Sequence, residues 1–293
     1  MNAEGYLGVP AGRVFYRIAG FGPPLVLIAG GEAGADAIER LQCELLYRFR
    51  VIAFDRRGLS RSASDDAGPA ISIESHAEDV RALIEQVAKE PAYVFGSAIG
   101  GLVGLELLCR RPECVRRLVA HEPPTSDLLG AEEEARLREA LAEMQVSFRR
   151  EGLQAALRIR ARLVGADPED READVEPPEL TPERERNLAV LMTNDLPAVR
   201  QYRLDLTALR IAARKIIPAG GRSTGATLLH ECAVALARTA DRPLVELPGG
   251  HTGWLLRPAA FGAALAALLD EGDASGDGAR QEPEQRDADP RPS

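Results

Sequence analysis

The chemistry of this chain depends on one glycine-rich turn between an apolar segment and a helical one. Residues 93–95 are apolar and favour a strand, and leucines recur at helical spacing after the turn. Gly96 and Gly100 flank the turn, where small residues permit strained backbone angles and close packing of helix on strand. The layout is that of a nucleophile elbow, G-x-S-x-G, which presents a reactive serine. Ala98 stands where that pattern has serine.

Ala98 excludes covalent catalysis from this position, because a methyl group has no lone pair. Ser97 is the neighbouring hydroxyl, but such a turn aims one residue upward and its neighbour points into packing. A register with Ser97 at the tip would place Ile99 where the pattern requires glycine. We therefore expect a site built like that of a serine hydrolase but without its nucleophile.

The elements around this turn alternate between strands and helices, which predicts an α/β fold with a parallel, doubly wound sheet. Residues 13–18 alternate and predict an edge strand. Further strands are expected at 25–28, 51–54, 93–95, 117–120, 216–221 and 244–247. Helices are expected up to about residue 47 and at 73–87, 228–239 and 255–269.

The alternation is interrupted by a charged, helix-favouring stretch, which predicts an inserted helical cap. We expect a core of residues 1–126 and 195–270, a cap of residues 127–194 and a disordered tail of residues 271–293. The tail is rich in Gly, Asp, Glu, Pro, Arg and Gln and has almost nothing to bury.

Composition limits the partners of this 293-residue chain. A net charge of -9 argues against binding to nucleic acid or to an anionic membrane surface. No apolar run is long enough for a membrane span, and the N-terminus does not resemble a signal peptide, so we expect a cytoplasmic protein. The four cysteines lack metal-binding spacing, and Cys43 and Cys109 are expected to be buried thiols. The oligomeric state stays open.

Four loops together resemble the α/β-hydrolase superfamily, most closely small bacterial hydrolases of actinomycete type with an epoxide hydrolase or haloalkane dehalogenase layout. They are the Gly30-Gly31 turn, the run D-x-R-G-x-S-x-S that begins at Asp55, the turn around Ala98, and Pro248-Gly-Gly-His251. The resemblance covers roughly residues 16–269 without the cap. It implies the α/β-hydrolase fold, with a mostly parallel sheet and an inserted helical cap.

The resemblance also assigns roles by position. His251 matches the catalytic histidine. The acid that orients it usually follows the seventh strand, but residues 220–225 contain no carboxylate, so Glu122 after the sixth strand is the expected acid. The rival interpretation of Glu122 is a cap on the first turn of the insertion. The backbone amides of Gly31 and Ile99 match the oxyanion donors.

Other side chains are expected to serve the pocket or the scaffold. Glu32, His121 and Trp254 are possible pocket residues, and Tyr202, like Trp254, either lines the pocket or packs. His76 and His230 lie on helices and are expected to face solvent or to pack. Asp55 and Arg57 are expected to hold their own loop, and the arginine-rich run at 149–162 to form a solvated helix surface.

Three functions agree with these residues. The favoured one is an enzyme that uses His251 and Glu122 as a base, with an oxyanion hole, for lyase, elimination, cyclisation or similar chemistry without a covalent intermediate. The second is a hydrolase of esters, lactones or epoxides, either disabled at Ala98 or using water activated by His251. The third is a non-catalytic ligand-binding pseudo-hydrolase. We expect a small, largely apolar organic substrate and no cofactor or metal.

Overall fold

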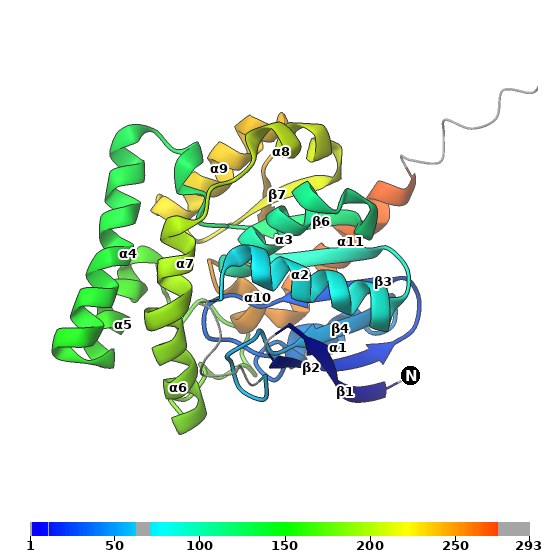
Figure 1. Cartoon of the computed structure of the whole chain (residues 1–293), viewed down its shortest axis with the longest axis horizontal. Helices are drawn as coiled ribbons and strands as arrows, with labels where there is room; N and C mark the ends of the chain where they lie inside the picture. Colours follow the sequence, from blue (N-terminus) through cyan, green and yellow to red (C-terminus); the bar gives the residue numbers. More distant parts are fainter. Residues whose placement is uncertain (1, 11, 63–70, 275–293) are drawn as a thin grey trace, which may run out of the picture.

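The computed structural model describes residues 2–10, 12–62 and 71–274, and its centre is a single eight-stranded sheet (Figure 1). The strand order is β1-β2-β4-β3-β5-β6-β7-β8, and every neighbouring pair from β4 to β8 is parallel. The strands are β1 (Asn2–Val9), β2 (Gly12–Gly20), β3 (Pro24–Ile28), β4 (Arg50–Phe54), β5 (Ala92–Ser97), β6 (Val115–His121), β7 (Ile216–Gly221) and β8 (Val245–Leu247). The predicted α/β fold with a mostly parallel sheet is confirmed.

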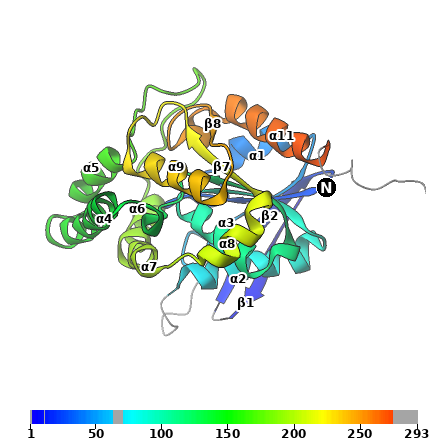
Figure 2. The same cartoon turned by 90° about the horizontal axis from the view of Figure 1, so that it is seen from above.

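Helices cover both faces of the sheet, so its central strands are buried on both sides. In Figure 2, α1 (Glu39–Leu45) and α11 (Pro258–Ala274) lie on one side, and α2 (Ile73–Leu83), α3 (Ile99–Arg110) and α8 (Leu206–Ala212) lie on the other. Leu229, Cys232 and Leu236 of α9 (Leu228–Ala240) belong to the same apolar cluster as buried residues of α2 and α3. All residues of β3 and β5 are buried, as expected for parallel strands between two helical layers.

The edge of the sheet differs from the prediction. The segment predicted as an edge strand, 13–18, lies within β2, which pairs with β4 on one side and with β1 on the other, antiparallel to both. The true edge strand, β1, gives no clear sequence signal because only Leu7 of its eight residues is buried. A strand that is solvated on both faces does not need the apolar alternation that identifies a half-buried strand.

Four smaller expectations are also corrected. The helix predicted over 73–87 changes to π-helical geometry at Ile84–Ala88. The helix predicted over 255–269 is divided into α10 (Gly253–Leu256) and α11, which begins at Pro258, a residue suited to a first helical position. Helix α11 continues to Ala274, past the predicted start of the tail, and residues 275–293 lie outside the described residues. Cys43 is exposed rather than buried.

A helical insertion lies between β6 and β7, as expected. We call four of its helices the cap helices, and they form the green and yellow-green group beside the sheet in Figure 1. They are α4 (Ala131–Glu151), α5 (Leu153–Leu163), α6 (Pro182–Val190) and α7 (Leu196–Gln201), with a π-helical turn, Leu191–Asp195, between the last two. The division into core and cap at residues 126/127 and 194/195 stays a prediction. Among the described residues, none of the helices has the length and apolarity needed to cross a membrane.

Candidate active site

The turn around Ala98 has the strained geometry expected of a sharp strand-to-helix connection. Ala98 has φ 49° and ψ -120°, between the end of β5 and the first residue of α3. A Cβ atom on Gly96 would lie 2.3 Å from the carbonyl oxygen of Gly100, and one on Gly100 would lie 2.2 Å from the carbonyl oxygen of Ile28. The glycines are therefore required by close backbone contacts on both sides of the turn.

His251 and Glu122 meet although they are far apart in sequence. His251 follows β8, and its Nδ1 atom lies 2.7 Å from Oε2 of Glu122, which directly follows β6. Both side chains are buried, and the Glu122 backbone has a left-handed φ of 44° that turns the carboxylate toward the histidine loop. A neutral His251 that donates its Nδ1 proton to this carboxylate keeps the Nε2 lone pair available as a base.

Glu122 has further partners on its second oxygen. The amide of Gly221 donates to Oε1 at 2.8 Å, and Nδ1 of His230 lies 3.4 Å from the same atom. Burial opposes ionisation of Glu122, but the hydrogen bonds with His230 and His251 outweigh it and lower the pKa of the carboxyl far below its usual range. Glu122 therefore accepts hydrogen bonds within the fold rather than capping the first cap helix, α4, which begins at Ala131.

His230 is the residue that sequence reasoning missed at this site. We expected it to face solvent or to pack, but it lies on the first turn of α9 between Glu122 and Glu246 of β8. The hydrogen bond with Glu122 raises the pKa of His230. The sequence did contain a signal for His230, because it lies near the start of the helix after β7. That position is close to the carboxyl ends of the strands, where the other site residues lie.

A cavity opens above the turn and is lined mostly by apolar side chains. Gly31, Ala98, Ile99 and His251 form its floor, and the remaining lining includes Leu141, Met144, Leu191, Leu196 and Val199 from the cap helices and the π-helical turn. As the first residue of α3, Ile99 carries an amide that the helix itself leaves without an acceptor. Gly31, the other expected oxyanion donor, has a φ of 56° in the turn after β3.

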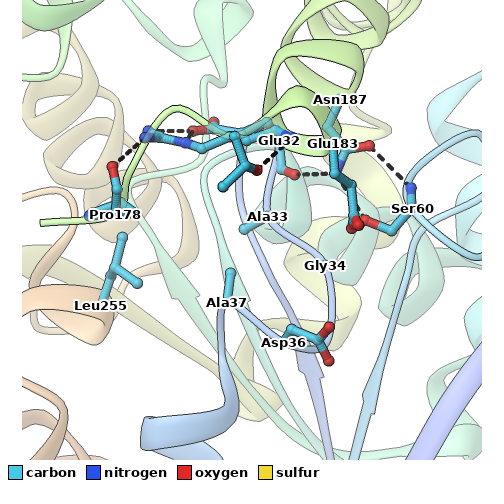
Figure 3. A pocket seen from close by; sticks show the side chains of 12 residues that line it. Glu32, Ala33, Gly34, Asp36, Ala37, Ser60, Pro178, Glu183, Asn187 and Leu255 are labelled. Carbon is cyan, nitrogen blue, oxygen red and sulfur yellow. Dashed lines mark hydrogen bonds and ion pairs between the residues drawn. The ribbon is translucent and has the colours of Figure 1, made fainter.

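Glu32 points toward the cap helices, where two arginines neutralise it. Arg184 of α6 contacts Oε1 through Nε at 3.1 Å and through Nη2 at 2.9 Å, and Arg160 of α5 contacts Oε2 at 3.1 Å. Figure 3 shows the Glu32 side chain beneath this part of the cap, next to Asn187 and Ser60. The expectation that the arginine-rich run at 149–162 is only a solvated surface is thus wrong for Arg160, which also lines the cavity above Ala98.

The remaining candidates lie behind or beside the cavity. Ser97 is 1% exposed, and its hydroxyl oxygen lies 3.4 Å from Nδ1 of His121. His121 is fully buried and contacts the rings of Phe95 and Phe261, and burial lowers its pKa to about 4. Trp254 is buried against the α1 and α11 side of the sheet and borders a separate hollow. None of these three is among the residues that line the cavity above Ala98.

Other polar residues hold the scaffold. Asp55 accepts from the Ala35 amide and from Arg61 within the loop after β4, as expected, whereas Arg57 pairs with Asp79 of α2. His76 is buried against Arg56, and the Tyr202 hydroxyl donates to Glu106, so neither lies free on the surface. Within the described ranges, no group of three or more His, Cys, Asp and Glu side chains is arranged to hold a metal ion.

Comparison with known proteins agrees with this architecture. Residues 23–187 match the family model of the alpha/beta hydrolase fold. The chain is 30% identical over 272 residues to the uncharacterized hydrolase YraK of Bacillus subtilis (strain 168), covering 92% of this chain and 96% of that protein. It is 42% identical over 106 residues to the putative carbamate hydrolase RutD of Azorhizobium caulinodans, which is 36% of this chain and only 39% of that protein.

Solved structures show the same fold at lower sequence identity. The enol-lactonase from Burkholderia xenovorans LB400 superposes with a TM-score of 0.66 and 23% identity, over 91% of this chain and 100% of that one. Similarity at this level of identity concerns the fold alone.

Proposed function

Because the chain belongs to the alpha/beta hydrolase fold family, we propose that it hydrolyses a small, largely apolar carbonyl compound, such as an ester, lactone or carbamate, with water as the direct nucleophile. Ala98 occupies the turn position of the missing serine, so no acyl-enzyme forms there. Hydrolase-named relatives support hydrolysis over the lyase or elimination chemistry that the sequence alone favoured. The hydrolase alternative is thus the better supported of the two.

One observation carries the proposal: the 2.7 Å contact between His251 Nδ1 and the buried Glu122 carboxylate, at a cavity that also contains Ala98. This contact fixes the imidazole so that its Nε2 atom is the free acceptor. Burial raises the pKa of Glu122, but the hydrogen bonds with His230 and His251 lower it by more, so Glu122 stays ionised. An ionised Glu122 stabilises the imidazolium that forms when His251 takes a proton.

The reaction follows from these positions. His251 Nε2 removes a proton from water, and the water oxygen forms a bond to the substrate carbonyl carbon. The carbonyl oxygen gains the negative charge and is stabilised by the amides of Gly31 and Ile99, near the positive end of α3. When the tetrahedral intermediate collapses, the bond to the leaving group breaks and the leaving group takes the proton from His251. The products are a carboxylic or carbamic acid and an alcohol, which stay in one molecule when the substrate is a lactone.

The test is hydrolysis of p-nitrophenyl acetate by the full chain and by four variants. We expect the parent to release p-nitrophenol without an initial burst, because no acyl-enzyme accumulates. His251→Ala and Glu122→Gln should each lower kcat by about 10²- to 10⁴-fold, the usual contribution of a general base. Ser97→Ala, which removes the neighbouring hydroxyl, is the matched control and should retain activity. Ala98→Ser should gain a burst and become labelled by a phosphonate probe.

Mass spectrometry of the reacting parent completes the test. A stable acyl adduct on the parent would contradict the proposal, as would full activity of His251→Ala. If neither the parent nor Ala98→Ser turns over or reacts, a ligand-binding role replaces hydrolysis.

A further inference from the structure

The contacts of the oxyanion turn point to a role for Glu32, and we propose that this residue is a positioning residue that couples closure of the cap to the oxyanion hole. The inference rests on the proposed function, because it assumes that the neighbouring Gly31 amide receives the developing charge. Glu32 itself does not line the cavity above Ala98, so its effect must act through the turn.

Glu32 joins the turn after β3 to two cap helices at once. Its Oε1 atom receives two hydrogen bonds from Arg184 of α6, and its Oε2 atom receives one from Arg160 of α5. The Arg160 guanidinium also lies over Gly31, where a Cβ atom would come within 3.1 Å of Nη2. One carboxylate thus holds both helices against the turn that carries the expected oxyanion amide.

Backbone contacts reinforce the same connection. Nδ2 of Asn187, also on α6, donates to the Glu32 carbonyl at 3.2 Å and to the Ser60 hydroxyl at 2.8 Å. Arg56 donates to the Gly31 carbonyl at 2.5 Å and pairs at 2.9 Å with Asp195 in the π-helical turn. The Glu32 carbonyl therefore accepts a hydrogen bond directly from the insertion. The Gly31 carbonyl is connected to the insertion through Arg56.

The burial of Glu32 makes the coupling strong. Its side chain is only 9% exposed, and a buried carboxylate is stable only when it is paired. Burial alone would raise its pKa, but Arg160 and Arg184 outweigh that effect and lower it. If the cap helices move away, Glu32 loses both partners and must turn toward water, which moves the adjacent Gly31 amide. The oxyanion hole is then complete only when the cap is closed.

Arg184 permits a test that does not touch the substrate site, because it is absent from the lining of the cavity above Ala98. We expect Glu32→Gln and Arg184→Gln each to lower kcat for p-nitrophenyl acetate by about 10- to 100-fold, approaching the loss of one oxyanion donor. KM should stay within about two-fold, because the substrate contacts remain. The double variant should be no worse than either single one, which is the result for two residues acting as one unit.

Asp36→Asn is the matched control. Asp36 is a carboxylate on the same loop, but it is exposed and pairs with Arg17 and Arg61 of the core. Figure 3 shows a second pocket, separate from the cavity above Ala98, with Asp36 at the opposite end from Glu32 and Asn187. We expect kcat and KM of this variant to equal those of the parent.

Hydrogen exchange provides a readout that needs no turnover. Amide exchange in a peptide containing residues 29–35 should accelerate in both Glu32→Gln and Arg184→Gln, and not in Asp36→Asn. Unchanged exchange in Arg184→Gln, or a higher KM with unchanged kcat in either variant, would overturn the coupling. If exchange accelerates as expected but no protein hydrolyses the ester, the coupling holds and the proposed function fails instead.

Discussion

At the scale of single residues, two neighbours in sequence differ in charge: Glu122 is ionised and His121 is neutral. Glu122 is held as a carboxylate by Gly221, His230 and His251. His121, directly before it, is fully buried, and within the described structure its Nε2 atom has no hydrogen-bond partner. Burial therefore keeps His121 neutral, whereas the hydrogen bonds of Glu122 outweigh its burial and keep it ionised.

The pH dependence of stability tests this interpretation of His121. Its pKa is about 4 in the folded chain, below the 6.5 of the unfolded chain, so between these values only the unfolded state binds a proton. His121 therefore does not change the free energy of unfolding above pH 6.5, and it lowers that free energy as the pH drops from 6.5 toward 4. The slope of the free energy of unfolding against pH measures the number of protons taken up on unfolding. We expect His121→Asn to lower this number by up to about one, measured by urea unfolding between pH 7 and 4.5.

The slope, not the absolute stability, is the readout, so a loss of packing in the variant does not obscure the result. A remaining slope is expected from His76, whose pKa is also lowered, first by burial and then by Arg56 and Arg57. An identical slope in the parent and in His121→Asn would show that His121 is protonated in the folded chain.

At the scale of elements, the unit of β5, the turn and α3 is built on backbone contacts rather than on side chains. The first turn of α3 approaches the end of β3 so closely that Gly100 has no room for a Cβ atom beside the carbonyl of Ile28. The contact is with backbone on both sides, so no side-chain rotation relieves it. The position of Ala98 above the sheet therefore depends on a glycine two residues away.

Gly100→Ala should show this dependence. We expect it to lower the free energy of unfolding by about 1–3 kcal/mol or more, because helix and strand must separate. Gly8→Ala on β1 is the control, since a Cβ atom there meets nothing within 4 Å. Urea unfolding of both variants gives the comparison, and equal stability of the two would mean that α3 shifts without cost.

At the scale of the whole molecule, buried charges connect the cap helices to the sheet. Arg56, in the loop after β4, pairs with Asp195 in the π-helical turn of the insertion, and the two side chains are 1% and 2% exposed. His76 of α2 lies beside the same guanidinium. A buried pair of this kind fixes position rather than adding much stability, because both charges have lost their hydration.

Removal of one partner should nevertheless be costly. Asp195→Ala leaves Arg56 buried without its carboxylate, and we expect the free energy of unfolding to fall by about 3–5 kcal/mol. Asp174→Ala is the control, because Asp174 also joins the insertion to the core, through Arg40, but at the surface. Thermal or urea unfolding should leave this control unchanged, and a similarly small effect of Asp195→Ala would indicate that water replaces the lost partner.

The sequence alone identified the sheet, the turn at Ala98 and the helical insertion. Strands buried on both faces are continuous apolar runs, and Gly96 and Gly100 are required by the backbone itself, so both signals are local. Resemblance to a known family placed Glu122 and His251 on loops after β6 and β8, and the structure brings them together. The carboxyl ends of parallel strands share one edge of the sheet, which makes this proximity a consequence of topology.

Only the tertiary structure decided which charged residues meet at the site. Arg160 and Glu32 are 128 residues apart, and His230 and Glu122 are 108 apart. The pattern of polar and apolar residues along a helix predicts which face of the helix is polar. It does not predict whether that face contacts solvent or a buried carboxylate from another element. The edge strand β1 was not predicted for a related reason: it buries too few residues to give an alternating apolar pattern. Local backbone requirements can be predicted from the sequence, whereas the pairing of distant charges depends on how the cap helices pack on the sheet.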